Sequence, residues 1–105
     1  MYTFILSDKA GKTLEHVSRA GNEAYLRTEE PRFRHLSDVG EIEGSSLNSG
    51  DMGELLDELS EIARGNLDDA EREHVRQLIA LAQRCALIDG VLTIAPLLRS
   101  DIRDV

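Results

Sequence analysis

The feature that most constrains this chain is a change of hydrophobic period near its middle. From residue 51 onward, apolar residues recur every three or four positions, as they do on one face of a helix. The first such stripe contains Leu55, Leu59 and Ile62 and ends at Gly65. Before residue 44, short apolar and β-branched runs alternate with turn residues, a pattern typical of strands. The chain is therefore expected to combine a strand-rich half with a helical half.

Both predicted helices begin with the same local pattern. Asp51 is followed by Glu54, and Asp68 by Glu71, so each start has the acid-x-x-Glu spacing of a capping box. The second apolar stripe then continues to residue 90. Because few residues separate the end of one helix from the start of the next, we expect an antiparallel helical hairpin over one face of a sheet.

The strands are predicted from short runs bounded by turns. Tyr2 to Leu6 and Thr13 to Val17 flank a loop containing Gly11, which favours a hairpin whose first strand is central because both of its faces are largely apolar. Ala24 to Thr28 is a plausible third strand with its leucine inward, after a turn at residues 20–22, and Val91 to Ala95 a last one. We therefore expect a small, mainly antiparallel sheet.

Three further segments are interpreted more loosely. Residues 33–42 fit a short strand or an irregular segment equally well. Gly44 to Gly50 is a loop by composition, and Leu97 to Val105 is a tail whose order is left open. The whole chain, residues 1–105, is expected to form a single α+β domain in which the helical hairpin packs on the sheet and a C-terminal strand completes it.

Charge limits the classes of partner. The chain carries 20 acids against 12 bases, a net charge of −8, and residues 41–73 hold 11 acids and 2 bases. Such a balance repels nucleic acid and anionic membranes and suits a positively charged protein. One cysteine, no leader-like N-terminus and no long apolar run predict a cytoplasmic protein without a membrane span.

Few residues offer catalytic or cofactor chemistry. Glu71-x-x-His74 has the spacing of half a metal site, but no second copy follows, so a solvated helix surface is preferred. His16 and His35 lie near no nucleophile signature; His16 is read as a partly buried strand residue and His35 as surface. Cys85 is expected in the core, and the glycines lack the lysine of a nucleotide loop. We predict no enzyme activity and no cofactor.

The strongest candidate feature is the acidic segment itself. Some of its acids are explained as helix caps, but Asp57, Glu58 and Glu61 have few bases at the spacing that would neutralise them. We interpret the segment as a docking surface for a cationic partner, against the alternative of a merely solubilising one. Its candidate partner-binding residues are Glu41, Glu43, Asp51, Glu54, Asp57, Glu58 and Glu61.

The layout resembles the small acidic immunity proteins of bacterial polymorphic toxin and contact-dependent inhibition systems. The resemblance rests on size, charge, the absence of catalytic residues, and three stretches of sequence. These are Gly44-Ser45-Ser46-Leu47, Leu55-Leu56-Asp57-Glu58-Leu59 and Asp68-Asp69-Ala70-Glu71-Arg72.

The resemblance implies a non-enzymatic inhibitor that neutralises a cognate toxin domain in the cytoplasm. That partner is expected to be basic and is possibly a nuclease. The alternative is a regulatory or scaffolding module that forms a homodimer through the hairpin strands or through Leu97, Leu98 and Ile102.

Overall fold

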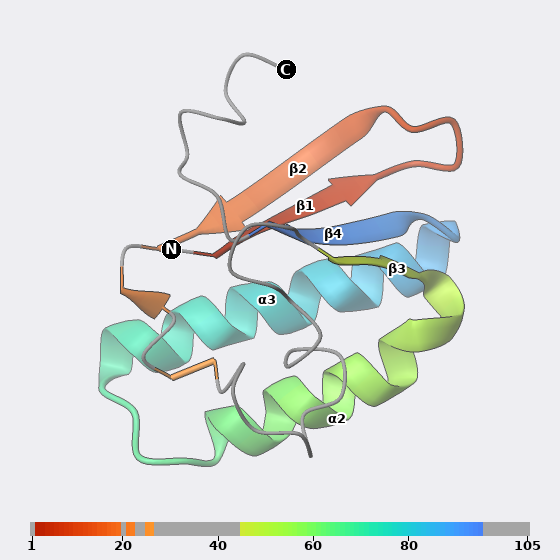
Figure 1. Ribbon diagram of the computed structural model, residues 1–105. Coiled ribbons are helices and arrows are strands. Elements are labelled where there is room, and N and C mark those ends of the chain that lie inside the picture. Colours follow the sequence, from red (N-terminus) through yellow and green to blue (C-terminus); the bar gives the residue numbers. More distant parts are fainter. Residues whose placement is uncertain (1, 20, 23–24, 27–44, 96–105) are drawn as a thin grey trace.

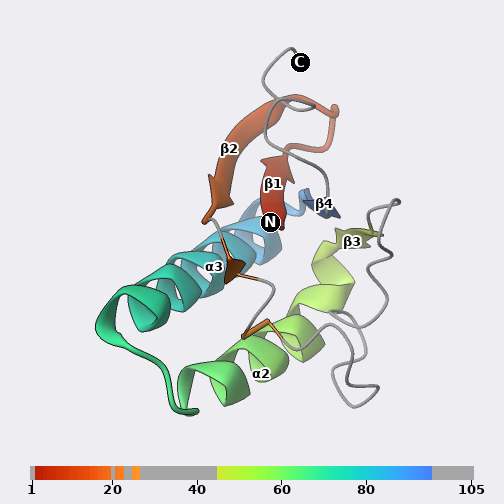
Figure 2. The ribbon, with the colours of Figure 1, turned by 60° about the vertical axis from the view of Figure 1, so that its left-hand side comes forward.

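A computed structural model describes residues 2–19, 21–22, 25–26 and 45–95 of the chain (Figure 1). Within these residues, one antiparallel sheet is formed by β1 (Thr3–Ser7), β2 (Thr13–Ser18), β3 (Ser45–Asn48) and β4 (Val91–Ala95), in the order β2-β1-β4-β3. Two helices, α2 (Met52–Ala63) and α3 (Asp69–Ile88), lie together on one face of that sheet (Figures 1 and 2). This arrangement confirms the expected α+β class, with a helical hairpin packed on an antiparallel sheet.

The N-terminal hairpin forms as predicted. β1 (Thr3–Ser7) pairs antiparallel with β2 (Thr13–Ser18). In the connecting loop the carboxylate of Asp8 accepts a hydrogen bond from the backbone N–H of Lys12 at 2.9 Å, and Gly11 adopts a φ of +88°. A positive φ is easily reached only by glycine, which explains this residue at the turn. β1 is central in the sheet, also as predicted.

The other half of the sheet contains a strand that the sequence did not predict. β4 (Val91–Ala95) lies between β1 and β3 (Ser45–Asn48), and β3 falls within residues 44–50, which were expected to form a loop. The expectation failed because β3 is held by backbone pairing with β4 rather than by a β-forming composition. Its register places the buried Leu47 opposite Leu92.

Helix α2 (Met52–Ala63) is confirmed, but its start differs from the prediction. A short 3-10 turn, η2 (Ser49–Asp51), precedes it, and Asp51 is already helical with φ −86° and ψ −10°. The Asp51 carboxylate accepts a hydrogen bond from the backbone N–H of Asn48 at 3.0 Å, and it makes no cap bond to α2. The predicted capping box of Asp51 with Glu54 is therefore wrong, because the chain enters the helical conformation one turn earlier.

Helix α3 (Asp69–Ile88) has the predicted start. The Asp68 carboxylate accepts a hydrogen bond from the backbone N–H of Glu71 at 2.8 Å, and the Glu71 carboxylate accepts one from the N–H of Asp68 at 3.0 Å. These two bonds satisfy amide groups that a helix terminus otherwise leaves without an intrahelical partner.

The far end of α3 is fixed by Asp89. Its backbone is left-handed, with φ 55°. Its carboxylate accepts a hydrogen bond from the Ser49 hydroxyl and pairs with the Lys9 ammonium at 3.2 Å. The Ser49 hydrogen bond, followed by the Lys9 contact, lowers the pKa of Asp89.

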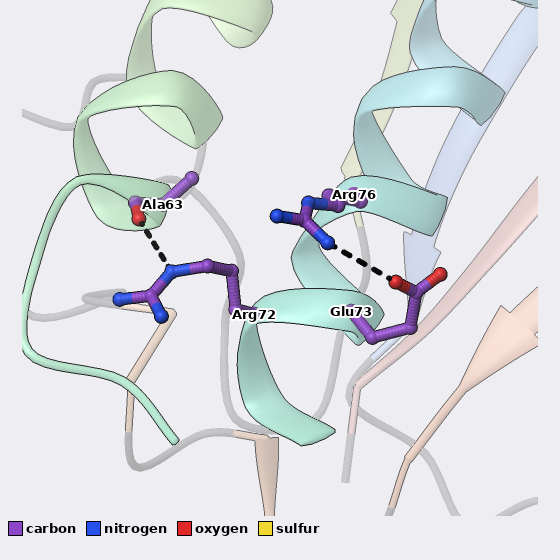
Figure 3. Close-up of polar contacts among 4 residues, drawn as sticks. All are labelled: Ala63, Arg72, Glu73 and Arg76. Carbon is purple, nitrogen blue, oxygen red and sulfur yellow. Dashed lines mark hydrogen bonds and ion pairs between the residues drawn. The ribbon is translucent and has the colours of Figure 1, made fainter. Parts of the chain in front are cut away.

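An arginine joins the two helices at their connection. The guanidinium of Arg72 on α3 donates from Nε to the carbonyl oxygen of Ala63 at 3.3 Å (Figure 3). It also donates from a terminal nitrogen to the carbonyl of Gly65 at 3.1 Å. Carbonyl groups at the end of a helix lack intrahelical donors, so Arg72 supplies what the last turn of α2 needs. The helical hairpin is thus fixed by a basic side chain inside the acidic segment.

The core fills the space between the sheet and the helices. Phe4 and Leu6 from β1 are fully buried, and so is Leu26, which confirms its inward position. Tyr25 and Leu26 form a turn and a bend rather than the expected strand, whose other residues lie outside the described part. Residues 33–42 and 97–105 also lie outside it. The helices and remaining strands contribute Leu47, Met52, Leu55, Leu59, Ile62, Val75, Leu78, Leu81, Ala82, Cys85, Leu92 and Ile94.

Candidate functional site

The exposed side of α2 holds three of the predicted partner-binding acids. Glu54, Asp57 and Glu61 are exposed, and their spacing of three and four residues places them on one face of the helix. The opposite face is anchored in the core through Leu55 and Leu59, both fully buried. These three residues, named here the acidic face, are therefore presented by a helix whose position is fixed by packing.

Glu58 does not belong to this face. Its side chain is buried, with 7% exposed, although it was expected to contact a partner. The reason lies in the spacing, because Glu58 stands three residues after Leu55 and four before Ile62 and so falls on the apolar stripe.

The remaining predicted acids are placed differently. Asp51 is half-buried and bonded to Asn48. Glu41 and Glu43 lie outside the described residues.

The acids are also less isolated than the sequence suggested. Glu54, Glu58 and Glu61 each take part in a polar or electrostatic contact. The sequence of α2 itself contains no base.

Acids at the start of α3 mainly serve the fold. Asp68 and Glu71 form the capping box described above. Glu73 is bonded to Arg76 on the next turn of the helix at 3.4 Å, and both side chains are more than half exposed (Figure 3). An exposed pair of this kind contributes little to stability. It does remove one carboxylate from the surplus of negative charge.

A buried polar cluster lies on the sheet-facing side of α3 and was missed by the sequence reasoning. His74 is 3% exposed, and its Nε2 atom lies 3.3 Å from the side-chain amide nitrogen of Asn22, which is fully buried. The Asn22 amide also accepts from the backbone N–H of Tyr2 and donates to its carbonyl, both at 2.8 Å. The Tyr25 ring meets His74 edge-on at 6.3 Å.

This cluster fixes the charge state of His74. The Asn22 amide nitrogen can only donate, so Nε2 must accept, which requires a neutral imidazole. Burial and, to a lesser degree, the charge of Arg19 lower the pKa of His74, while a hydrogen bond with Gln77 acts in the opposite direction. The cluster connects the N-terminal strand to α3.

The predicted solvated position of His74 is therefore wrong. The alternative of a metal half-site gains no support either, since Glu71 is used in the capping box and the described residues contain no group of three metal-binding side chains. The sequence signal that could have pointed to this buried cluster was the Gly21-Asn22 pair, but the pair was interpreted only as a turn. Gly21 does have the positive φ of such a turn, at +81°.

The structure also places two of the other residues that were considered as catalytic or reactive candidates, His16 and Cys85. His16 is exposed rather than partly buried, because β2 is an edge strand and neither helix covers the side of the sheet from which His16 projects. His35 lies outside the described residues. Cys85 is fully buried, and burial raises the pKa of its thiol, which confirms its place in the core. No helix in the described part is long and apolar enough to cross a bilayer.

Comparison with protein-family models, curated proteins and solved structures finds no match for this chain. Its function is therefore inferred from its own residues.

Proposed function

We propose that this domain is a non-enzymatic protein-binding inhibitor that docks on a basic protein through the acidic face of α2. Among such inhibitors, an immunity protein that neutralises a cognate toxin domain fits best the small size and the net charge of −8. The observation behind the proposal is that Glu54, Asp57 and Glu61 share one exposed side of a helix that contains no base.

Two physical effects support this use of the face. A rigid helix packed on a core presents its charges at fixed spacing, so little conformational entropy is lost when a partner binds. A negative field also steers a cationic partner toward the surface and raises the association rate, by about 10-fold or more at low salt. Both effects are expected of an inhibitor that must capture its target quickly.

The proposal predicts that charge reversal on the acidic face weakens binding. The test isolates the partner by pull-down from cells that produce the protein and measures its association rate by surface plasmon resonance at low and high salt. The double variant Asp57→Lys with Glu61→Lys is expected to slow association by about 10-fold at low salt and by much less at high salt.

A matched control separates the face from net charge alone. Asp69→Lys with Glu73→Lys makes the same change of charge at exposed positions on α3 and is expected to have a much smaller effect. The proposal fails if both double variants slow association equally. It also fails if the pull-down recovers no basic toxin domain.

A further inference from the structure

Asn22 is a junction between the N-terminal strand, the turn that follows β2, and helix α3. Its side-chain oxygen accepts a hydrogen bond from the backbone N–H of Tyr2, and its amide nitrogen donates to the Tyr2 carbonyl, both at 2.8 Å. Its backbone carbonyl accepts from the N–H groups of Tyr25 and Leu26, at 3.2 and 3.1 Å. The same amide nitrogen lies 3.3 Å from Nε2 of His74, and this contact links the junction to α3.

The Asn22 amide has no freedom to adjust to a change at His74. A flip of the amide would turn its nitrogen toward the Tyr2 N–H and its oxygen toward the Tyr2 carbonyl, so both hydrogen bonds to Tyr2 would be lost. In the unflipped amide one hydrogen is used on the Tyr2 carbonyl, which leaves the other for His74. The group that faces Nε2 is therefore fixed as a donor.

The imidazole of His74 can gain a proton only at the nitrogen that faces this donor. In a neutral imidazole one nitrogen carries the proton and the other accepts, so acceptance at Nε2 places the proton on Nδ1. The hydrogen bond with the Gln77 side chain raises the pKa of His74, which is the direction expected when the ring donates. A second proton must then bind at Nε2, where two donors would meet at 3.3 Å.

Charged groups near His74 do not compensate for a second proton. The charged and titratable side chains on the elements packed around it are Arg19 after β2, Tyr25 in the turn, Asp68 and Glu71 at the start of α3, and Glu58 on α2. The positive charge of Arg19 acts on His74 and opposes another positive charge there. The carboxylates of Asp68 and Glu71 are engaged in the capping box and act on Arg19. The surroundings thus favour the neutral ring.

We propose that Asn22 and His74 form a latch that neutral imidazole keeps closed and acid opens. Protonation at Nε2 sets two donors against each other, and the turn that contains Asn22 separates from α3. Tyr25 and Leu26, which are buried and bonded to the Asn22 backbone, move with it, so an apolar surface is exposed beside α3. The strand pairs of the sheet and the Asp68 capping box contain none of these residues and remain formed. The latch acts independently of the acidic face.

The test is native-state hydrogen exchange of the intact protein, followed by NMR at several pH values and corrected for the intrinsic effect of pH on exchange. The amides of Tyr2, Tyr25 and Leu26 report the latch, and those that pair β1 with β4 report global unfolding. Because opening is local, the latch amides should be less protected than the strand amides and insensitive to low urea concentrations. Below pH 6.5 their protection should fall about tenfold per pH unit, since only the open latch binds the proton.

Two variants separate the latch from a merely structural contact. In His74→Gln no proton can bind, so the protection of the Tyr25 and Leu26 amides should stay level as the pH falls. Asn22→Asp keeps the shape of the side chain but faces His74 with an acceptor of negative charge, so the pKa of His74 should rise above 6.5 and the latch should stay closed in acid.

Three results would overturn the latch. The first is that the latch amides share the protection and the urea dependence of the strand amides, which would show that the turn opens only when the whole domain unfolds. The second is that His74→Gln loses protection in acid as the natural sequence does. The third is that Asn22→Asp responds to pH in the same direction as the natural sequence.

Discussion

His74 is expected to make this protein acid-sensitive, and replacing it with glutamine should remove that sensitivity. In the fold His74 is neutral, because its Nε2 accepts from the Asn22 amide and burial lowers its pKa below the ordinary 6.5. A glutamine side chain at this position offers a carbonyl oxygen as acceptor but has no proton to gain. His74→Gln therefore keeps a hydrogen-bond acceptor while removing the titration.

The direction and size of the effect follow from proton linkage. Above pH 6.5 both the folded and unfolded states hold a neutral imidazole, and the contribution of His74 to stability is fully present. As the pH falls below that value the unfolded chain binds a proton and the folded protein does not. The free energy of unfolding should then drop by up to about 1.4 kcal/mol per pH unit, until the lowered pKa of the folded state is reached.

The assay is urea unfolding of both proteins at several pH values on either side of 6.5, combined with an NMR titration of the imidazole. Carboxylates titrate in both proteins, so the difference between the two stability curves isolates His74. At neutral pH the substitution should cost only about 1 kcal/mol, the usual contribution of a hydrogen bond. Parallel curves, or an imidazole that titrates above 6.5 in the folded protein, would show that His74 is not held neutral.

Three further substitutions probe local contacts in the sheet and the helices. Gly90→Ala should lower the free energy of unfolding by about 1–3 kcal/mol, because a Cβ there would collide with the backbone carbonyl of Ser7. Gly53→Ala in α2, where a Cβ meets no described atom, should instead raise the free energy of unfolding by about 0.5–1 kcal/mol. Equal shifts of the melting temperature in Gly90→Ala and Gly53→Ala would contradict the expected collision at Gly90. Asp68→Ala should cost about 1 kcal/mol through loss of the cap on Glu71, and unchanged urea unfolding would show that the capping box contributes nothing.

The helices could be predicted because their signals are local. The apolar spacing and the Asp68 capping box act within one or two turns of the chain, so α3 begins where the sequence indicates. β3 could not be predicted in this way. Its strand conformation depends on pairing with β4, which lies more than forty residues away, and nothing in Ser45–Asn48 by itself favours a strand.

The candidate site likewise has a part that could be predicted from the sequence and a part that could not. Spacing alone places Glu54, Asp57 and Glu61 on one side of a helix, and the structure exposes them. The burial of Glu58 could have been read from its position on the apolar stripe. The surroundings of His74 could not, because they depend on Asn22 folding back onto α3 from a distant part of the chain.

The position of β1 and β4 at the centre of the sheet has a consequence for biosynthesis. Thr3 pairs with Ala95, so the central strand pair of the sheet joins the first and the last of the described strands in chain order. The hairpin, α2 and α3 are synthesised before β4, so their apolar surfaces stay open to water until β4 emerges and pairs with β1. Contacts between such distant segments make folding slow. A nascent chain halted before residue 91 is therefore expected to need protection from aggregation.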